Sequence, residues 1–204
     1  MARTPTDQSQ TSQATMQSPA GQPLAHESAI KHVSGQAVYI DDLPLPANTI
    51  YVSTGKSSIA AGRLIKLDLD AVRSSPGVVD ILVFSDIPGN PDISPVYEGD
   101  VLLVDQHISF IGQPLFAVAA ANQQQAEAAI GRAVIEYTPC EPILSIDQAM
   151  AEQAFVLPSR QFSLNDVDKG MQESDGQLSG ALYIKGQEHF YLEGQISVAV
   201  PVED

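Results

Sequence analysis

Two short helical segments, each lying between apolar strand-like runs, limit what this chain can fold into. The first, Asp68–Arg73, has aspartates in its first turn and an arginine in its last turn, as the dipole of a helix favours. A Pro-Gly pair at 76–77 ends this helix, and apolar runs at 63–67 and 78–84 flank it. The pattern therefore predicts a β–α–β unit.

The second helical segment follows a strongly apolar strand at 113–121. Asn122 is a good N-cap, and Gln125 stands three residues later in a capping-box arrangement. Small residues then recur at helical spacing to about Val134 and predict a narrow face that packs closely on a sheet. A further strand at 134–137 completes a second β–α–β unit, so the fold class is α+β with mixed β–α–β units.

Shorter patterns place the remaining elements. Apolar runs predict strands at 37–40, 49–53, 100–104 and from Gln195 to the end of the chain. Ser145 starts a short helix by the same capping logic. Ser, Thr and Gln fill 12 of the first 25 positions, so residues 1–25 are expected to be a disordered polar tail. Residues 151–180 are polar and are predicted to be a surface linker.

The net charge of −15, from 25 acidic and 10 basic residues, excludes the basic surface that a phosphate backbone or an anionic membrane requires. No run of 18 apolar residues could span a membrane, and the first residues lack the apolar region of a secretory signal, so a cytoplasmic location is expected. Cys140 is the only cysteine, which excludes an internal disulfide or a thiolate cluster. We expect a buried or half-buried structural thiol.

Motifs that carry chemistry are missing from the sequence. It contains no G-x-G-x-x-G, no P-loop and no G-x-S-x-G nucleophile elbow. The acidic pairs at 41–42 and at Asp68 and Asp70 fit turn and cap positions, and the segment 165–170 lacks the carboxylate pattern of a calcium loop. The four histidines are interpreted as hydrogen-bonded structural residues: His26, His32, His107 and His189.

The densest run of functional side chains, Gly186–Glu193, combines an imidazole, two aromatic rings and several hydrogen-bonding groups. Two interpretations stay open: a position near a cofactor cavity, or a packing seam between domains, which the polar-tipped aromatic rings favour. The roles of Gln187, His189 and Glu193 are left undecided. After the run, Leu192 and the apolar residues at 196, 198 and 200 alternate as a one-faced strand whose partners lie elsewhere.

Several stretches together resemble the molybdenum-binding large subunit of bacterial xanthine dehydrogenase, of the xanthine oxidase and aldehyde oxidase family. The similarity covers about 26–204 in the order and spacing of that family. Its pieces are His26–Ala29, His32–Ala37, Tyr39–Asp42, Pro76–Val78, Asp86–Asn90, Gly112–Pro114, Glu136–Tyr137, Pro142–Leu144, Asp166–Gly170 and Gly186–Glu193. Two positions depart from the pattern: Lys185 replaces a common glycine, and Gly194 replaces a common threonine.

The resemblance implies a domain plan. Residues 26–150 would form an α/β hammerhead domain and residues 151–180 a linker. Residues 181–204 would provide the first strands of a truncated molybdopterin-binding domain. The cofactor loops, the catalytic glutamate and the substrate-binding arginine of the family would lie beyond residue 204. No catalytic, cofactor-binding or metal residue is therefore assigned to this chain.

The implied activity is that of a molybdenum hydroxylase that oxidises purines. Molybdenum–molybdopterin would serve the full-length enzyme, with 2Fe-2S clusters and FAD on a partner subunit or domain and a second copy forming a homodimer. A small purine would be the substrate, with no nucleic acid or membrane partner. Alone, this chain is expected to bind no cofactor and to be inactive. The alternative is a stand-alone interaction module that pairs with the iron–sulfur/FAD subunit or with a complementing fragment.

Overall fold

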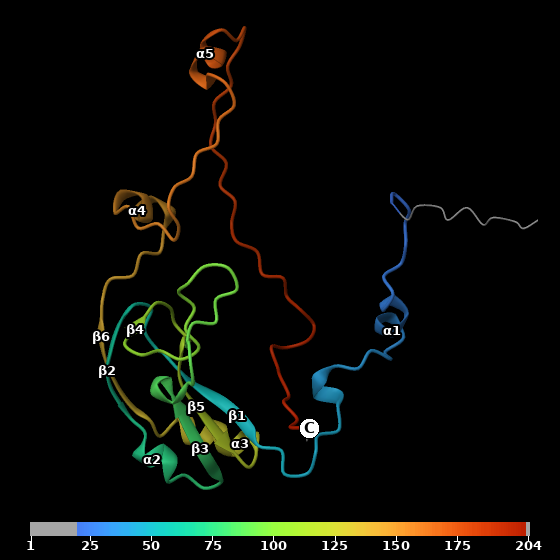
Figure 1. Cartoon of the computed structure of the whole chain (residues 1–204), viewed down its shortest axis with the longest axis vertical. Helices are drawn as coiled ribbons and strands as arrows, with labels where there is room; N and C mark the ends of the chain where they lie inside the picture. Colours follow the sequence, from blue (N-terminus) through green and yellow to red (C-terminus); the bar gives the residue numbers. More distant parts are fainter. Residues whose placement is uncertain (1–19, 203–204) are drawn as a thin grey trace, which may run out of the picture. The chain divides into compact units, whose positions relative to one another are not determined.

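The computed structural model describes residues 20–202, which divide into two compact units. The larger unit is Leu45–Lys185, and the smaller one joins the segment before it, Met1–Pro44, to the segment after it, Gly186–Asp204. Figure 1 labels their elements. Most of the polar tail expected at 1–25 lies outside the described residues, and its remaining positions from 20 onward are exposed.

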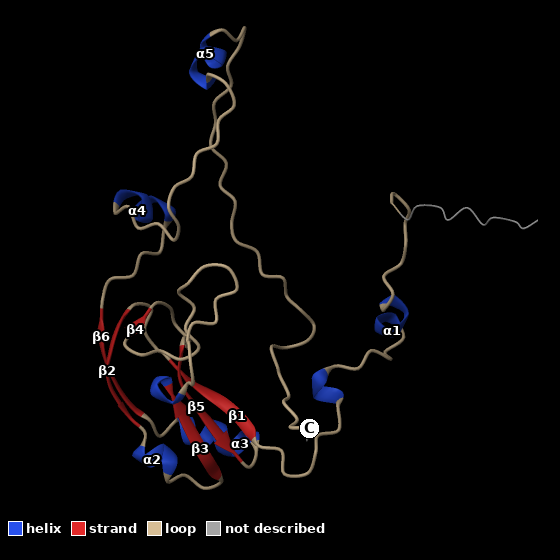
Figure 2. Cartoon of the chain, in the orientation of Figure 1, coloured by secondary structure: helices blue, strands red, loops and turns tan. Residues whose placement is uncertain are grey.

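Two three-stranded antiparallel sheets form the body of the larger unit (Figure 2). The first sheet has the order β1 (Tyr51–Lys56), β5 (Pro114–Ala120), β3 (Val78–Val83). The second has the order β4 (His107–Ile108), β2 (Gly62–Asp68), β6 (Val134–Pro139). Together with the helices, these sheets confirm the α+β class.

The apolar run at 114–120 forms the central strand of the first sheet, β5, and it supplies much of the core. Leu115, Phe116 and Val118 are fully buried. Five residues from other parts of the unit complete the buried cluster around them: Val72, Ile81, Val104, Ile108 and Ala129. A strand buried on both faces reads as a continuous apolar run, and this explains the composition of β5.

The helices connect the two sheets. α2 (Asp70–Arg73) joins β2 to β3, and α3 (Gln123–Ile130) joins β5 to β6, so the elements follow the predicted order. The strands that flank each helix nevertheless belong to different sheets and pair with other strands. Parallel pairing across α2 is disfavoured because a parallel crossover needs about a dozen residues or more.

Helix α3 begins as the sequence predicts. The side chain of Asn122 accepts a hydrogen bond of 2.9 Å from the backbone N–H of Gln125. Ala126 and Ala129 are buried where α3 packs on the first sheet, as expected of a face of small residues. The reciprocal half of the capping box is missing, because the Oε1 atom of Gln125 is buried without a hydrogen-bond partner, next to Gly77.

Three predicted strands are wrong. Residues 37–40 are not extended into a sheet and instead lead into the 3-10 helix η1 (Ile40–Asp42). At 100–104 only the isolated bridge between Asp92 and Val101 forms, although Leu103 and Val104 are buried. From 195 to 202 the described backbone contains no strand. Apolar residues make a strand only where a partner offers hydrogen bonds, and the local pattern does not reveal that partner.

The region between β6 and residue 185 contains two short helices. α4 (Ile146–Ala151) begins after Ser145, whose side chain accepts from the N–H of Gln148 as predicted. α5 (Val167–Gln172) was not expected within the polar segment 151–180, and its N-cap is the neighbouring aspartate. Neither helix contains a buried residue. The limits 26–150, 151–180 and 181–204 for hammerhead, linker and second domain stay a prediction.

Candidate functional site

The run Gly186–Glu193 belongs to the smaller unit, together with helix α1 (Ala29–Val33) and η1. Seven of its eight residues are exposed, and only Glu193 is half-buried. Its Oε1 atom accepts a hydrogen bond of 2.8 Å from the backbone N–H of Ile40. Glu193 therefore ties the run to the start of η1, where backbone N–H groups have no partner inside the helix.

The aromatic part of the run makes local contacts. The rings of His189 and Tyr191 stack with centroids 5.3 Å apart and planes 4° from parallel. Phe190 between them has a φ of 55°, an uncommon conformation for a residue with a side chain, and its N–H donates to Oε1 of Glu188 at 3.4 Å.

The side chains of the run can be compared with what a molybdenum–molybdopterin group would require. Such a cofactor needs several donors that converge on its phosphate and pterin atoms. In the run, Gln187 makes no side-chain hydrogen bond within residues 20–202, and the carboxylate of Glu193 already binds Ile40. No group of three His, Cys, Asp or Glu side chains among these residues could hold a metal ion. The assignment of no catalytic or cofactor residue to this chain stays a prediction.

The other histidines make separate local contacts. His26 accepts at Nδ1 from the N–H of Ser28 at 3.1 Å, and His32 shares a hydrogen bond of 3.1 Å with the Tyr39 hydroxyl. His107 is an exposed residue of β4. The interpretation as hydrogen-bonded structural residues is thus confirmed for His26 and His32, whereas His189 makes a ring contact instead.

Cys140 is exposed, which corrects the expectation of a buried or half-buried thiol. It follows the end of β6, and its backbone N–H donates to the carbonyl of Ala61 at 3.0 Å. Pro139, the last residue of β6, has no backbone N–H to donate to the ladder, and Pro142 follows shortly after the strand ends.

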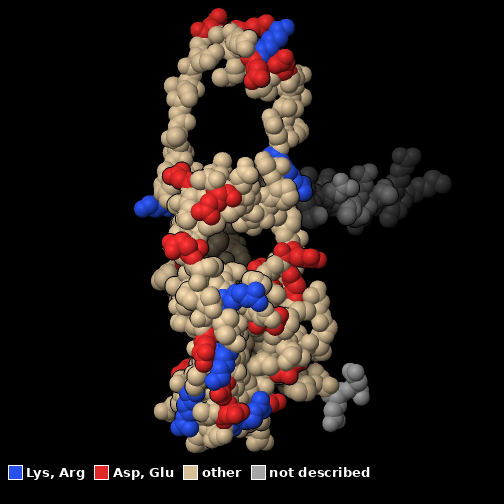
Figure 3. Space-filling model, turned by 90° about the vertical axis from the view of Figure 1, so that its left-hand side faces the viewer, with Lys and Arg blue, Asp and Glu red and all other residues tan. Residues whose placement is uncertain are grey.

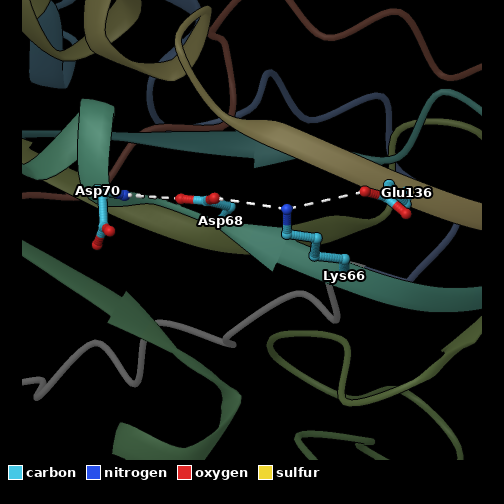
Figure 4. A network of polar contacts seen from close by, with 4 residues as sticks. All are labelled: Lys66, Asp68, Asp70 and Glu136. Carbon is cyan, nitrogen blue, oxygen red and sulfur yellow. Dashed lines mark hydrogen bonds and ion pairs between the residues drawn. The ribbon is translucent and has the colours of Figure 1, made fainter.

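The acidic residues near β2 have structural partners (Figure 4). Lys66 lies between Asp68 and Glu136, with N–O distances of 3.6 and 3.8 Å. Asp68 also accepts a hydrogen bond from the N–H of Asp70 at 3.3 Å. All three charged partners of this network are 40% exposed or more, so it is a solvated surface network. The interpretation of Asp68 and Asp70 as turn and cap residues rather than a catalytic pair agrees with these contacts.

A second carboxylate organises the loop before β4. Asp92 accepts hydrogen bonds from the backbone N–H groups of Ser94 at 2.8 Å and Gly99 at 2.7 Å. The Ser94 side chain first, and then these two N–H groups, hold the pKa of Asp92 below its usual value. All of these donors come from the same loop, so this carboxylate stabilises the local turn.

Figure 3 shows acidic and basic side chains interspersed over the described residues of one face of the molecule. This face has no dominant basic surface. Among the helices of the described part, none has both the length and the apolar character that a bilayer crossing requires.

The larger unit, two antiparallel three-stranded sheets joined through α2 and α3, has the architecture of an α/β hammerhead domain. The family profile described as "Aldehyde oxidase and xanthine dehydrogenase, a/b hammerhead domain" matches residues 34–141. The chain belongs to the aldehyde oxidase and xanthine dehydrogenase family.

Comparison with individual proteins agrees with this family. The chain is 37% identical to aldehyde oxidase 1 of Bos taurus over 91% of its own length and 14% of that protein. It is 35% identical to xanthine dehydrogenase/oxidase of Gallus gallus over 89% of its length and 13% of that protein. The chain thus spans only 13–14% of the length of these curated relatives.

Solved structures show the same fold. The aldehyde oxidoreductase of Desulfovibrio desulfuricans superposes with a TM-score of 0.57 over 63% of this chain and 16% of that one, at 24% identity. The reconstituted CO dehydrogenase of Oligotropha carboxidovorans gives a TM-score of 0.52 over 62% of this chain and 16% of that one, at 26% identity. These values confirm the hammerhead fold that the sequence resemblance implied.

One contact was missed at the sequence level, the bond between Ile40 and Glu193. Tyr39 and Ile40 read as part of an apolar strand, and Glu193 reads as one of several polar groups in a dense run. No local signal joins residues that are 153 positions apart. The only sequence feature that singles out Glu193 is its position at the end of the dense run 186–193, and this feature does not indicate Ile40 as its partner.

Proposed function

We propose that this chain provides the hammerhead domain of a xanthine dehydrogenase-type molybdenum hydroxylase of the bacterial kind. The family match over residues 34–141 carries the proposal, because it covers the two-sheet body that the structure describes. In this role the chain contributes structure to a larger enzyme, in which molybdenum–molybdopterin, 2Fe-2S clusters and FAD would carry the electrons. Purine oxidation is the proposed activity of that larger enzyme.

The same proposal makes the 204-residue chain inactive by itself. Its dense polar run uses Glu193 in an internal hydrogen bond, and the other seven residues of the run are exposed. The test is to purify the chain, measure molybdenum by elemental analysis and follow xanthine-dependent dye reduction, with a complete family enzyme as positive control. We expect no molybdenum above background and no reduction. Stoichiometric molybdenum together with xanthine-dependent reduction would overturn the proposal.

The substrate class is a separate question, because the chain is similar to aldehyde oxidases and to a xanthine dehydrogenase at 37% and 35% identity. We propose a purine on the basis of the sequence resemblance described above. The complete enzyme that contains this chain would be assayed with xanthine, hypoxanthine and an aldehyde, because the residues that bind the substrate are expected beyond residue 204. Turnover of the aldehyde alone would contradict a purine substrate.

A second candidate function is a stand-alone module that pairs with an iron–sulfur/FAD subunit or with a complementing fragment. It is favoured by exposed apolar residues in two short stretches of the C-terminal part of the described chain, one stretch in each unit. They are Leu182, Tyr183, Ile184, Phe190, Tyr191 and Leu192, all at least 67% exposed. Co-purification of a tagged chain with such a subunit, seen by its flavin and iron–sulfur absorbance, would support this function. The main proposal also includes a second copy that forms a homodimer in the full enzyme, which sedimentation tests. It includes a cytoplasmic location, which cell fractionation tests.

A further inference from the structure

The smaller unit is assembled from two pieces of chain that the whole hammerhead body separates. The described residues before position 45 and after position 185 make up this unit. Most of these residues are exposed, and the partly shielded ones are few. They are Ser28, Ala29, Ala37, Tyr39, Ile40 and Glu193. Five come from the first piece and only Glu193 from the second, so the contact between the pieces is centred on one side chain.

The geometry around that side chain is that of a capped helix start. Tyr39 is the N-cap of η1, and its own N–H donates to the Asp42 carboxylate at 3.0 Å. The next N–H along the chain, that of Ile40, donates to Glu193 at 2.8 Å. Two carboxylates therefore accept the first two N–H groups of one turn. A charged acceptor makes a stronger hydrogen bond than a neutral one, and the start of a helix favours negative charge.

We propose that residues 37–42 are the docking surface for the segment that begins at Gly186, and that Glu193 is the residue that holds it there. The hammerhead body at 45–185 is then an insertion between two pieces of a second structural unit. The compact body of the larger unit begins near residue 45, whereas the family profile begins at residue 34, and residues 26–44 belong structurally with the C-terminal segment. This inference concerns chain organisation and does not depend on the proposed activity.

The alternative is that the two pieces meet only transiently and that any polar residue of the run could replace Glu193. Glu188 provides the matched control. It is a glutamate in the same run, is exposed, and accepts only from the nearby N–H of Phe190. If Glu193 is the docking residue, its removal separates the pieces, whereas removal of Glu188 leaves them together.

The experiment uses the full chain with a nitroxide spin label at Ser197→Cys, in a Cys140→Ser background because Cys140 is exposed. We expect the label to broaden the amide signals of residues 38–42, and Glu193→Ala to abolish this broadening. Glu193→Gln, which keeps a neutral acceptor, should give an intermediate result, and Glu188→Ala should match the parent. Unchanged amide signals in β5, such as that of Val118, show that the body is still folded.

Hydrogen exchange at the Ile40 amide gives a second readout that does not need the label. Glu193→Ala should raise its exchange rate by about fivefold or more, the factor that corresponds to one net hydrogen bond, and Glu188→Ala should not. The proposal is overturned if the label leaves residues 38–42 unbroadened in the parent chain. It is equally overturned if Glu193→Ala leaves both the broadening and the Ile40 exchange rate unchanged.

Discussion

Gly55 lies directly opposite Phe116 in the register of β1 and β5, and the Phe116 ring occupies the space where a side chain at position 55 would begin. Val83 of β3 is the register partner of Phe116 on the other side of β5. Phe116 is fully buried and is one of the largest residues of the core. Because position 55 has no side chain, the Phe116 ring can lie against β1 and fill this part of the core.

The substitution Gly55→Ala should destabilise the fold by about 1–3 kcal/mol, because the added methyl group overlaps the Phe116 ring in a close-packed interior. Urea denaturation followed by circular dichroism measures the change. Gly180→Ala is the control, since Gly180 is exposed with open space around it, and it should change stability by less than about 0.5 kcal/mol. Equal stability of the two variants would show that the contact is relaxed in solution.

The same contact can be tested from its other side. Phe116→Leu replaces the ring by a smaller aliphatic side chain. It should recover part of the stability lost through Gly55→Ala, although it lowers stability by itself. A double-mutant cycle isolates this coupling, which we expect to be about 0.5–3 kcal/mol, the usual range for residues in contact. Strict additivity of the two substitutions would mean that they act independently.

The N-cap of α3 predicts a second effect on stability. Asn122→Ala removes the acceptor for the Gln125 N–H and should cost about 1 kcal/mol, whereas Asn122→Asp should keep most of the stability. Gln124→Ala serves as the matched control, because Gln124 is an exposed residue of the same first turn. Thermal and urea unfolding measure all three variants. The capping role would be refuted if Asn122→Ala and Gln124→Ala lost the same amount.

The loop around Asp92 predicts a pH dependence. Hydrogen bonds from Ser94 and Gly99 lower the pKa of this carboxylate below its ordinary value of 3.8. A lowered folded-state pKa stabilises the loop at pH values above 3.8, and this contribution is lost as the pH falls through the folded-state pKa. The amide signals of Ser94 and Gly99 should therefore titrate below pH 3.8, and the same signals in Asp92→Asn should not titrate there. A midpoint at or above 3.8 in the parent chain would contradict the hydrogen-bond geometry.

Much of the larger unit could be predicted from the sequence because its signals are local. The apolar run of β5, the cap at Asn122 and the small-residue face of α3 each depend on residues within one element. The pairing of the strands could not be predicted in this way. In both β–α–β patterns the two flanking strands belong to different sheets. The sequence of a single strand does not indicate which other strand it pairs with.

The wrong strand predictions lie in segments whose structure depends on residues far away in the sequence. Residues 37–40 look like a strand, yet they lead into η1, whose first N–H meets a carboxylate 153 positions later. The alternation at Ile196 and Val198 also looks like a strand, but no partner strand lies within the described residues and both side chains are about 40% exposed. For the candidate site, the sequence singled out the run at 186–193 but could not assign a partner to any of its side chains.

We infer that the two-sheet hammerhead body is the stable part of this chain. We also infer that Glu193 holds the C-terminal segment to η1. Residue-resolved hydrogen exchange of the full chain tests both inferences most directly, because local stability sets the protection of each amide. We expect the slowest exchange in β5, at Leu115 to Val118, measurable protection at Ile40, and fast exchange throughout 195–202. Strong protection across 195–202, or exchange in β5 as fast as in that segment, would contradict it.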